Sequence, residues 1–156
     1  MDKKRILICG ATGFIGRNLL EHFEGDEKYS VRATFHNKRP SKKPNNTEWV
    51  YADLTNQEHV KRVMRDVDIV LQYAATTSGA KDIVARPYIH VTDNAVMNSL
   101  ILREAYEQGV EHFIMPSCTI MYQSSEKLVS EDDFNESDEI FEKYYLFLFL
   151  NKINKH

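Results

Sequence analysis

One segment near the start of the chain joins a short apolar run to three evenly spaced glycines. Residues 5 to 16 read Arg-Ile-Leu-Ile-Cys-Gly-Ala-Thr-Gly-Phe-Ile-Gly, and the apolar run 6–8 is typical of a strand that is buried on both faces. Residues 18–23 then supply the apolar positions of a helix. The segment therefore predicts a strand, a glycine-rich turn and a helix in direct succession.

Each glycine has its own role in such a turn. Gly10 allows the tight turn, Gly13 lets the backbone approach a pyrophosphate, and Gly16 lets the helix pack closely on the strand. The N–H groups at the start of the helix would face the phosphates, where the helix dipole also favours negative charge. The motif predicts a dinucleotide-binding turn made of Gly10, Ala11, Thr12, Gly13, Phe14, Ile15 and Gly16. A glycine-rich turn that binds no ligand is the alternative.

Composition limits the classes of protein to be considered. With 156 residues, 42% of them hydrophobic, the chain can bury one sizeable core, so we expect a single domain over residues 1–156. The net charge of −3 argues against a nucleic-acid partner. The basic cluster in the sequence is also short and lies in a Pro/Asn-rich loop. No apolar stretch approaches the length of a membrane span and no signal-peptide core follows the start, which favours a cytoplasmic protein.

The cysteines and histidines indicate neither a disulfide framework nor a metal site. Cys9 and Cys118 each end a predicted strand, where reduced and buried thiols are the ordinary case. The six histidines are scattered, without a second ligand at metal-binding spacing. We therefore expect no metal.

Strands and helices alternate along the rest of the sequence. Further strands are predicted at 29–35, 49–52, 68–73 and 111–115, and further helices at 56–64 and 90–108. Thr55 or Asn56 is expected to cap the first of these helices, and Gly109 to end the second. Residues 36–47 and 117–134 are predicted as long loops. This order predicts an α/β fold with a Rossmann-like, doubly wound parallel sheet, whose ligands bind at the carboxyl ends of the strands.

Five segments at these strand ends and in the long helix resemble one family. They are the glycine motif 10–16, Asp53-Leu54, Ala74-Ala75, Asn94, and Ser117-Cys118-Thr119-Ile120-Met121-Tyr122. In this order they resemble the extended short-chain dehydrogenase/reductases, specifically the NAD(P)-dependent nucleotide-sugar epimerases and dehydratases, over residues 4 to about 143. The resemblance implies a nicotinamide cofactor and a nucleotide-sugar substrate.

The resemblance also implies roles for single residues. Asp53 would accept a hydrogen bond from the adenine amino group while Leu54 packs on the ring, although Asp53 also fits a solvated strand end. Ala74 and Ala75 would let the backbone run beside the cofactor, although ordinary core packing also suits them. Asn94 would stabilise the sheet or the nicotinamide end, and an exposed polar position is the alternative.

The end of the second predicted strand bears on the choice of cofactor. A carboxylate there would bind the ribose diol of NAD and repel a 2′-phosphate. The chain has no acidic residue there but has His36, Asn37, Lys38 and Arg39, and cationic side chains pair well with a phosphate. We therefore expect NADP rather than NAD, with a solvated basic loop as the alternative.

The catalytic residues of the family are only partly matched. Its members use a tyrosine and a lysine in a Tyr-x-x-x-Lys arrangement, together with a Ser or Thr hydroxyl. The hydroxyl position aligns with Cys118, a weaker donor, so Ser117 or Thr119 would take that role. No Tyr-x-x-x-Lys occurs near the C-terminus, and Tyr144 is at best a displaced catalytic tyrosine, with an aromatic on a terminal apolar helix as the alternative.

The chain ends soon after the apolar run 144–150, where the family would continue into a substrate-binding subdomain. We therefore expect a C-terminally truncated form with impaired catalysis, and a possible homodimer through the apolar C-terminus. Two functions stay open: the cofactor-binding half of a nucleotide-sugar epimerase or dehydratase, and a non-catalytic dinucleotide-binding or protein-interaction module.

Overall fold

The structure is a computed structural model that describes residues 3–41, 44, 46–76, 88–117, 122 and 125–133. The chain divides into two units. The first comprises Met1–Ala75 and Val96–Pro116, and the second Thr76–Ala95 and Ser117–His156. Each unit is described by itself, and the single domain expected over 1–156 stays a prediction.

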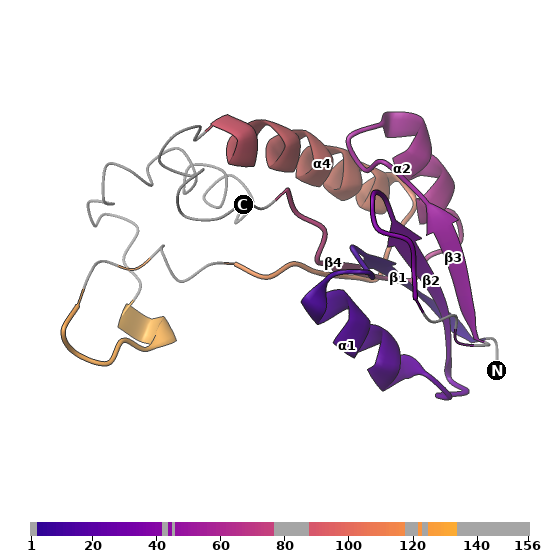
Figure 1. Cartoon of the computed structure of the whole chain (residues 1–156), viewed down its shortest axis with the longest axis horizontal. Coiled ribbons are helices and arrows are strands. Elements are labelled where there is room, and N and C mark those ends of the chain that lie inside the picture. Colours follow the sequence, from indigo (N-terminus) through magenta and orange to yellow (C-terminus); the bar gives the residue numbers. More distant parts are fainter. Residues whose placement is uncertain are drawn as a thin grey trace. The chain divides into compact units, whose positions relative to one another are not determined.

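A five-stranded parallel sheet forms the centre of the first unit (Figure 1). Its strands, in the spatial order β3-β2-β1-β4-β5, are β1 (Lys4–Cys9), β2 (Tyr29–Phe35), β3 (Thr47–Tyr51), β4 (Ile69–Gln72) and β5 (His112–Ile114). All neighbouring strands pair in parallel. The predicted Rossmann-like α/β sheet is therefore confirmed. β2 has the expected bounds, and the ends of the other strands are shifted by one or two residues.

Helices cover both faces of this sheet, because side chains of β1 alternate between two apolar clusters. Ile6 and Ile8 pack on one face with Leu20 of α1 (Phe14–Phe23). Leu7 and Cys9 pack on the other face with α2 (Gln57–Met64) and with the part of α4 (Tyr88–Glu107) that starts at Val96. The strand predicted to be buried on both faces is confirmed, since residues 6–9 are at most 1% exposed.

Polar groups mark the helix ends that the sequence indicated. Asn56, rather than Thr55, caps α2, and its side chain accepts from the N–H groups of Glu58 and His59. Gly109 follows α4 with a φ of +71°, a conformation that favours glycine and ends helices.

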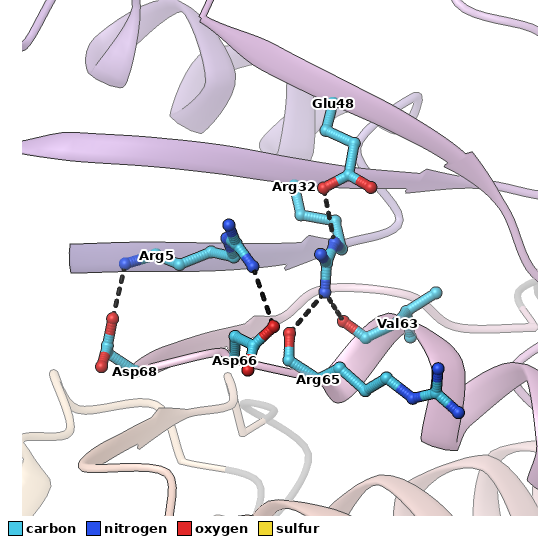
Figure 2. A network of polar contacts seen from close by, with 7 residues as sticks. All are labelled: Arg5, Arg32, Glu48, Val63, Arg65, Asp66 and Asp68. Carbon is cyan, nitrogen blue, oxygen red and sulfur yellow. Dashed lines mark hydrogen bonds and ion pairs between the residues drawn. The ribbon is translucent and has the colours of Figure 1, made fainter. Parts of the chain in front are cut away.

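A buried arginine ties α2 to the sheet (Figure 2). Arg32 of β2 donates from Nη1 to the main-chain oxygens of Val63 and Arg65 at 2.8 and 2.7 Å, and from Nε to Glu48 at 2.8 Å. Nearby, the N–H of Arg5 donates to Asp68 at 2.6 Å. The two bonds from Nη1 of Arg32 satisfy the carbonyl groups of Val63 and Arg65 at the C-terminal end of α2, where carbonyl groups lack partners within the helix.

In the second unit the structure describes the first residues of α4, the short 3-10 helix η2 (Glu131–Asp133) and the chain leading to it. In η2, Asp133 accepts hydrogen bonds from the N–H and hydroxyl of Ser130. No helix within the described part of the chain has both the length and the apolar character needed to cross a membrane.

Candidate functional site

Two of the three motif glycines are required by the protein's own backbone. Gly10 has a φ of +71°, and a Cβ atom there would lie 2.7 Å from the Cα of Ala74. A Cβ atom at Gly16 would lie 2.7 Å from the Cα of Ala11. Both distances are too short for a side chain, so these glycines make the tight turn and bring α1 against it. The close packing predicted at Gly16 is therefore made with the turn at the end of β1.

Gly13 is different, because the described residues oppose a side chain less strongly there. Its φ of −74° is ordinary, and among those residues a Cβ atom would meet the main-chain oxygen of Gly10 at 3.2 Å, a tight contact that a small shift of this oxygen would relieve. Gly13 is the N-cap of α1, yet no side chain caps this helix. A small polar residue would be the usual choice at such a position.

The start of α1 therefore has unsatisfied donors. Among the described residues, the N–H groups of Phe14, Ile15 and Gly16 find no acceptor. In α2, by contrast, the side-chain oxygen of Asn56 accepts hydrogen bonds from two N–H groups at the start of the helix, at 3.0 and 3.2 Å. Free N–H groups and the positive end of the helix dipole together form a site for an anion.

Thr34 of β2 fixes the glycine turn from the side. Its hydroxyl oxygen accepts from the N–H of Gly10 at 3.2 Å, and its main-chain oxygen accepts from the N–H of Ala11 at 3.1 Å. Thr34 is only 1% exposed. We did not predict this role from the sequence; the available signal was a threonine at a buried position of a strand whose other buried residues, apart from Arg32, are apolar.

Two cavities bring together several of the predicted cofactor residues, and one of them borders the glycine turn. One, of about 360 Å³, is lined by Ala11 and Thr12 of the turn and by Lys38 and Arg39 of the loop after β2. The other, of about 550 Å³, is lined by Phe35, His36, Asn37, Arg39, Pro40, Trp49 and Tyr51. Arg39 lines both cavities, and so does Trp49, whose buried Nε1 has no hydrogen-bond partner among the described residues.

Asp53 follows β3 and is held in place by its neighbours. Its carboxylate accepts from the hydroxyl of Thr55 at 2.7 Å and from the N–H of Thr55 at 2.9 Å. These two bonds hold the pKa of Asp53 below its usual value. The N–H of Asp53 donates to Nδ1 of His59 at 3.1 Å. Leu54 is 7% exposed and belongs to the core cluster. The roles predicted for both residues toward adenine stay predictions.

The chain leaving β4 lies against the glycine turn. Ala74 is the residue that a side chain at Gly10 would strike, and Ala75 is exposed. Gln72, which we did not predict as a site residue, hydrogen-bonds both main-chain groups of Ala74. Ala74 thus lies beside the turn, and the roles predicted for Ala74 and Ala75 toward a cofactor stay predictions.

Comparison with known proteins shows the family of the chain. A family model described as the NAD dependent epimerase/dehydratase family matches residues 6–145. The chain belongs to this family. The resemblance inferred from the five sequence segments is therefore confirmed, and the turn at residues 10–16 lies within the matched region.

Individual members of the family are more distant. The chain is 28% identical to mouse dTDP-D-glucose 4,6-dehydratase over 145 residues, which cover 86% of this chain and 39% of that protein. It is 25% identical to rice (Oryza sativa subsp. indica) GDP-mannose 3,5-epimerase 1 over 138 residues, which cover 88% of this chain and 36% of that protein. The chain thus spans less than half the length of these relatives.

Solved structures of similar fold include MoeE5 in complex with UDP-glucose and NAD. It matches with a TM-score of 0.76 and 19% identity, covering 96% of this chain and 47% of that one. At this identity the likeness shows the fold alone.

Most of the residues predicted for catalysis lie outside the part of the chain that the structure describes. Ser117 is exposed just after β5. Cys118, Thr119 and Tyr144 lie outside the described residues, as does the apolar C-terminal run expected to form a homodimer. In the second unit, the side chain of Asn94 accepts from the N–H of Thr76 at 2.8 Å and donates to its main-chain oxygen at 3.1 Å. Asn94 thus holds the main chain of Thr76, and its predicted role toward the nicotinamide stays a prediction.

Proposed function

We propose that this chain binds a nicotinamide dinucleotide, with the pyrophosphate at the N-terminus of α1, as the cofactor-binding part of an enzyme that acts on nucleotide sugars. Gly13 carries the proposal. The backbone of Gly10 and Gly16 leaves no room for a side chain, whereas Gly13 has an ordinary φ and could hold a capping residue. A ligand that approaches the backbone closely explains why Gly13 has no side chain and α1 has no cap.

We propose NADP as the preferred form of the cofactor. The cavity of about 550 Å³ has no carboxylate among its lining residues, and Arg39 is one of them. The smaller cavity is lined by Lys38 and Arg39, but the carboxylates of Glu21 and Glu24 line it as well. The larger cavity is therefore the better place for a 2′-phosphate, which an arginine binds through two parallel hydrogen bonds.

The nucleotide-sugar substrate rests on the family. Its matched relatives are by name a dTDP-D-glucose dehydratase and a GDP-mannose epimerase. When bound, the nicotinamide would supply hydride exchange with a sugar carbon. The chain's own described residues would bind and orient the dinucleotide: the turn at Gly13 holds the pyrophosphate and Arg39 the 2′-phosphate. The truncation, the impaired catalysis and the cytoplasmic location expected above stay predictions.

Titration of the full chain with NADPH and, separately, NADH tests the proposal. Nicotinamide fluorescence gives the Kd, and specific binding to the folded state must also raise the Tm. We expect saturable binding of both, with NADPH bound more tightly. Binding of neither would overturn the proposal, and tighter binding of NADH would overturn the preference for NADP. Incubation of the loaded chain with dTDP-glucose or GDP-mannose then separates an enzyme from a binding module.

A further inference from the structure

The segment that follows β4 supports the glycine turn. Ala74 lies so close to Gly10 that a Cβ atom at Gly10 would be 2.7 Å from its Cα and 2.8 Å from its nitrogen. The position of the turn at Gly10 therefore depends on the position of the main chain at Ala74. Any shift of Ala74 would change the space into which the turn fits.

Gln72 fixes that main chain with its side-chain amide. Its Nε2 donates to the main-chain oxygen of Ala74 at 3.1 Å, and its Oε1 accepts from the N–H of Ala74 at 3.2 Å. Gln72 is 2% exposed at the end of an otherwise apolar strand, where a polar side chain is costly unless it is hydrogen-bonded. Both polar atoms of the side chain are used for this purpose.

The main chain of Ala74 sets the orientation of this amide, because its N–H needs an acceptor and its oxygen needs a donor. Asn98 of α4 adds a third hydrogen bond, since its Oδ1 accepts from Nε2 of Gln72 at 2.8 Å. The amide is therefore held in one orientation rather than two.

We infer that Gln72 and Asn98 are positioning residues of the dinucleotide site, which act through Ala74 on the turn at Gly10 without touching the ligand. This inference rests on the proposed function, because it assumes that the turn binds a dinucleotide. It differs from a merely structural role in one measurable respect. Loss of the Gln72 amide should weaken ligand binding more than an equally destabilising change elsewhere in the core.

The experiment compares Gln72→Met with Val63→Ala in the full chain. Methionine keeps the length of the side chain but removes both bonds to Ala74. Val63, 1% exposed in α2, has no part in the site, so Val63→Ala lowers stability alone. At a temperature where all variants are folded, we expect the Kd of NADPH to rise about tenfold in Gln72→Met, the factor equal to about 1.4 kcal/mol, and to change less than about twofold in Val63→Ala.

A second pair keeps the test valid if Gln72→Met does not fold. Asn98→Asp retains an acceptor oxygen for Nε2 of Gln72, whereas Asn98→Leu removes it. We expect Asn98→Leu to weaken NADPH binding and Asn98→Asp to retain it. Equal Kd values for Gln72→Met and Val63→Ala, or for the two Asn98 variants, would overturn the inference while the proposed function stands. Absence of binding in the wild-type chain would overturn both.

Discussion

Nη1 of Arg32, on β2, donates to the main-chain oxygen of Val63, near the end of α2, at 2.8 Å (Figure 2). The same nitrogen reaches the main-chain oxygen of Arg65 at 2.7 Å. A cation at the C-terminus of a helix also interacts favourably with the helix dipole. Arg32 therefore connects the sheet to α2, the helix that follows Asp53 in the chain.

We predict that Arg32→Met lowers the free energy of unfolding by about 2–4 kcal/mol, because the buried carbonyl groups lose their donor. Chemical denaturation measures the change. Glu48→Gln is the control: the carboxylate side chain is 56% exposed, so its ion pair with Arg32 should contribute less than about 1 kcal/mol. An equal loss in both variants would show that the ion pair, rather than the bonds to α2, makes the contribution.

For Gly13→Ser we predict opposite effects on stability and on binding. Serine is a preferred N-cap, so it would satisfy an N–H of α1 and keep the Tm within a few degrees of wild type. The same side chain would occupy the approach of the pyrophosphate and raise the Kd of NADPH at least about a hundredfold. Gly16→Ala should instead lower the Tm sharply, since its Cβ atom would meet the main chain of Ala11. Unchanged binding in Gly13→Ser would contradict the role given to this glycine.

Arg39→Gln should separate the two cofactors. Without the guanidinium, the Kd of NADPH should rise about tenfold, because a charge-assisted contact to the 2′-phosphate is lost. The Kd of NADH should change little. Parallel fluorescence titrations measure both values, and an equal loss for the two dinucleotides would assign Arg39 to a part of the ligand that they share.

The pKa of Asp53 gives a dependence on pH. Hydrogen bonds from Thr55 lower this pKa in the folded state. Asp53 therefore contributes stability that is present above the unfolded pKa of about 3.9 and is lost as the pH falls through the lower folded value. Thr55→Val removes the hydroxyl donor and should raise the pKa of Asp53, measured by NMR titration of its carboxyl carbon. An unshifted pKa would show that the N–H of Thr55 suffices.

The local pattern of the sequence was enough to predict the strands and the glycine turn. The apolar run 6–8 and the alternation of apolar and polar residues over 29–35 mark strands by themselves. Gly10 is required by the positive φ of its own backbone. The start of α1 was less clear. Because its N-cap, Gly13, has no polar side chain, no capping signal marks Phe14 as the first residue of the helix.

Long-range pairing explains the residues that sequence reasoning missed. The hydroxyl of Thr34 reaches Gly10 only because β1 and β2 pair with Ile8 beside Ala33. The side chain of Gln72 donates to Asn98, which is 26 residues away on α4. Neither contact can be predicted from the spacing of residues along the chain. Asn56 is the N-cap of α2, whereas the hydroxyl and the N–H of Thr55 both donate to Asp53.

The most direct test of the account is a ¹H–¹⁵N NMR spectrum of the full chain with and without NADPH. We predict that the amide signals of Phe14, Ile15 and Gly16 shift most strongly, because their free N–H groups would face the pyrophosphate. These three signals should not shift in Gly13→Ser. Shifts that spare these amides, or no shifts at saturating NADPH, would contradict the placement of a dinucleotide at the N-terminus of α1.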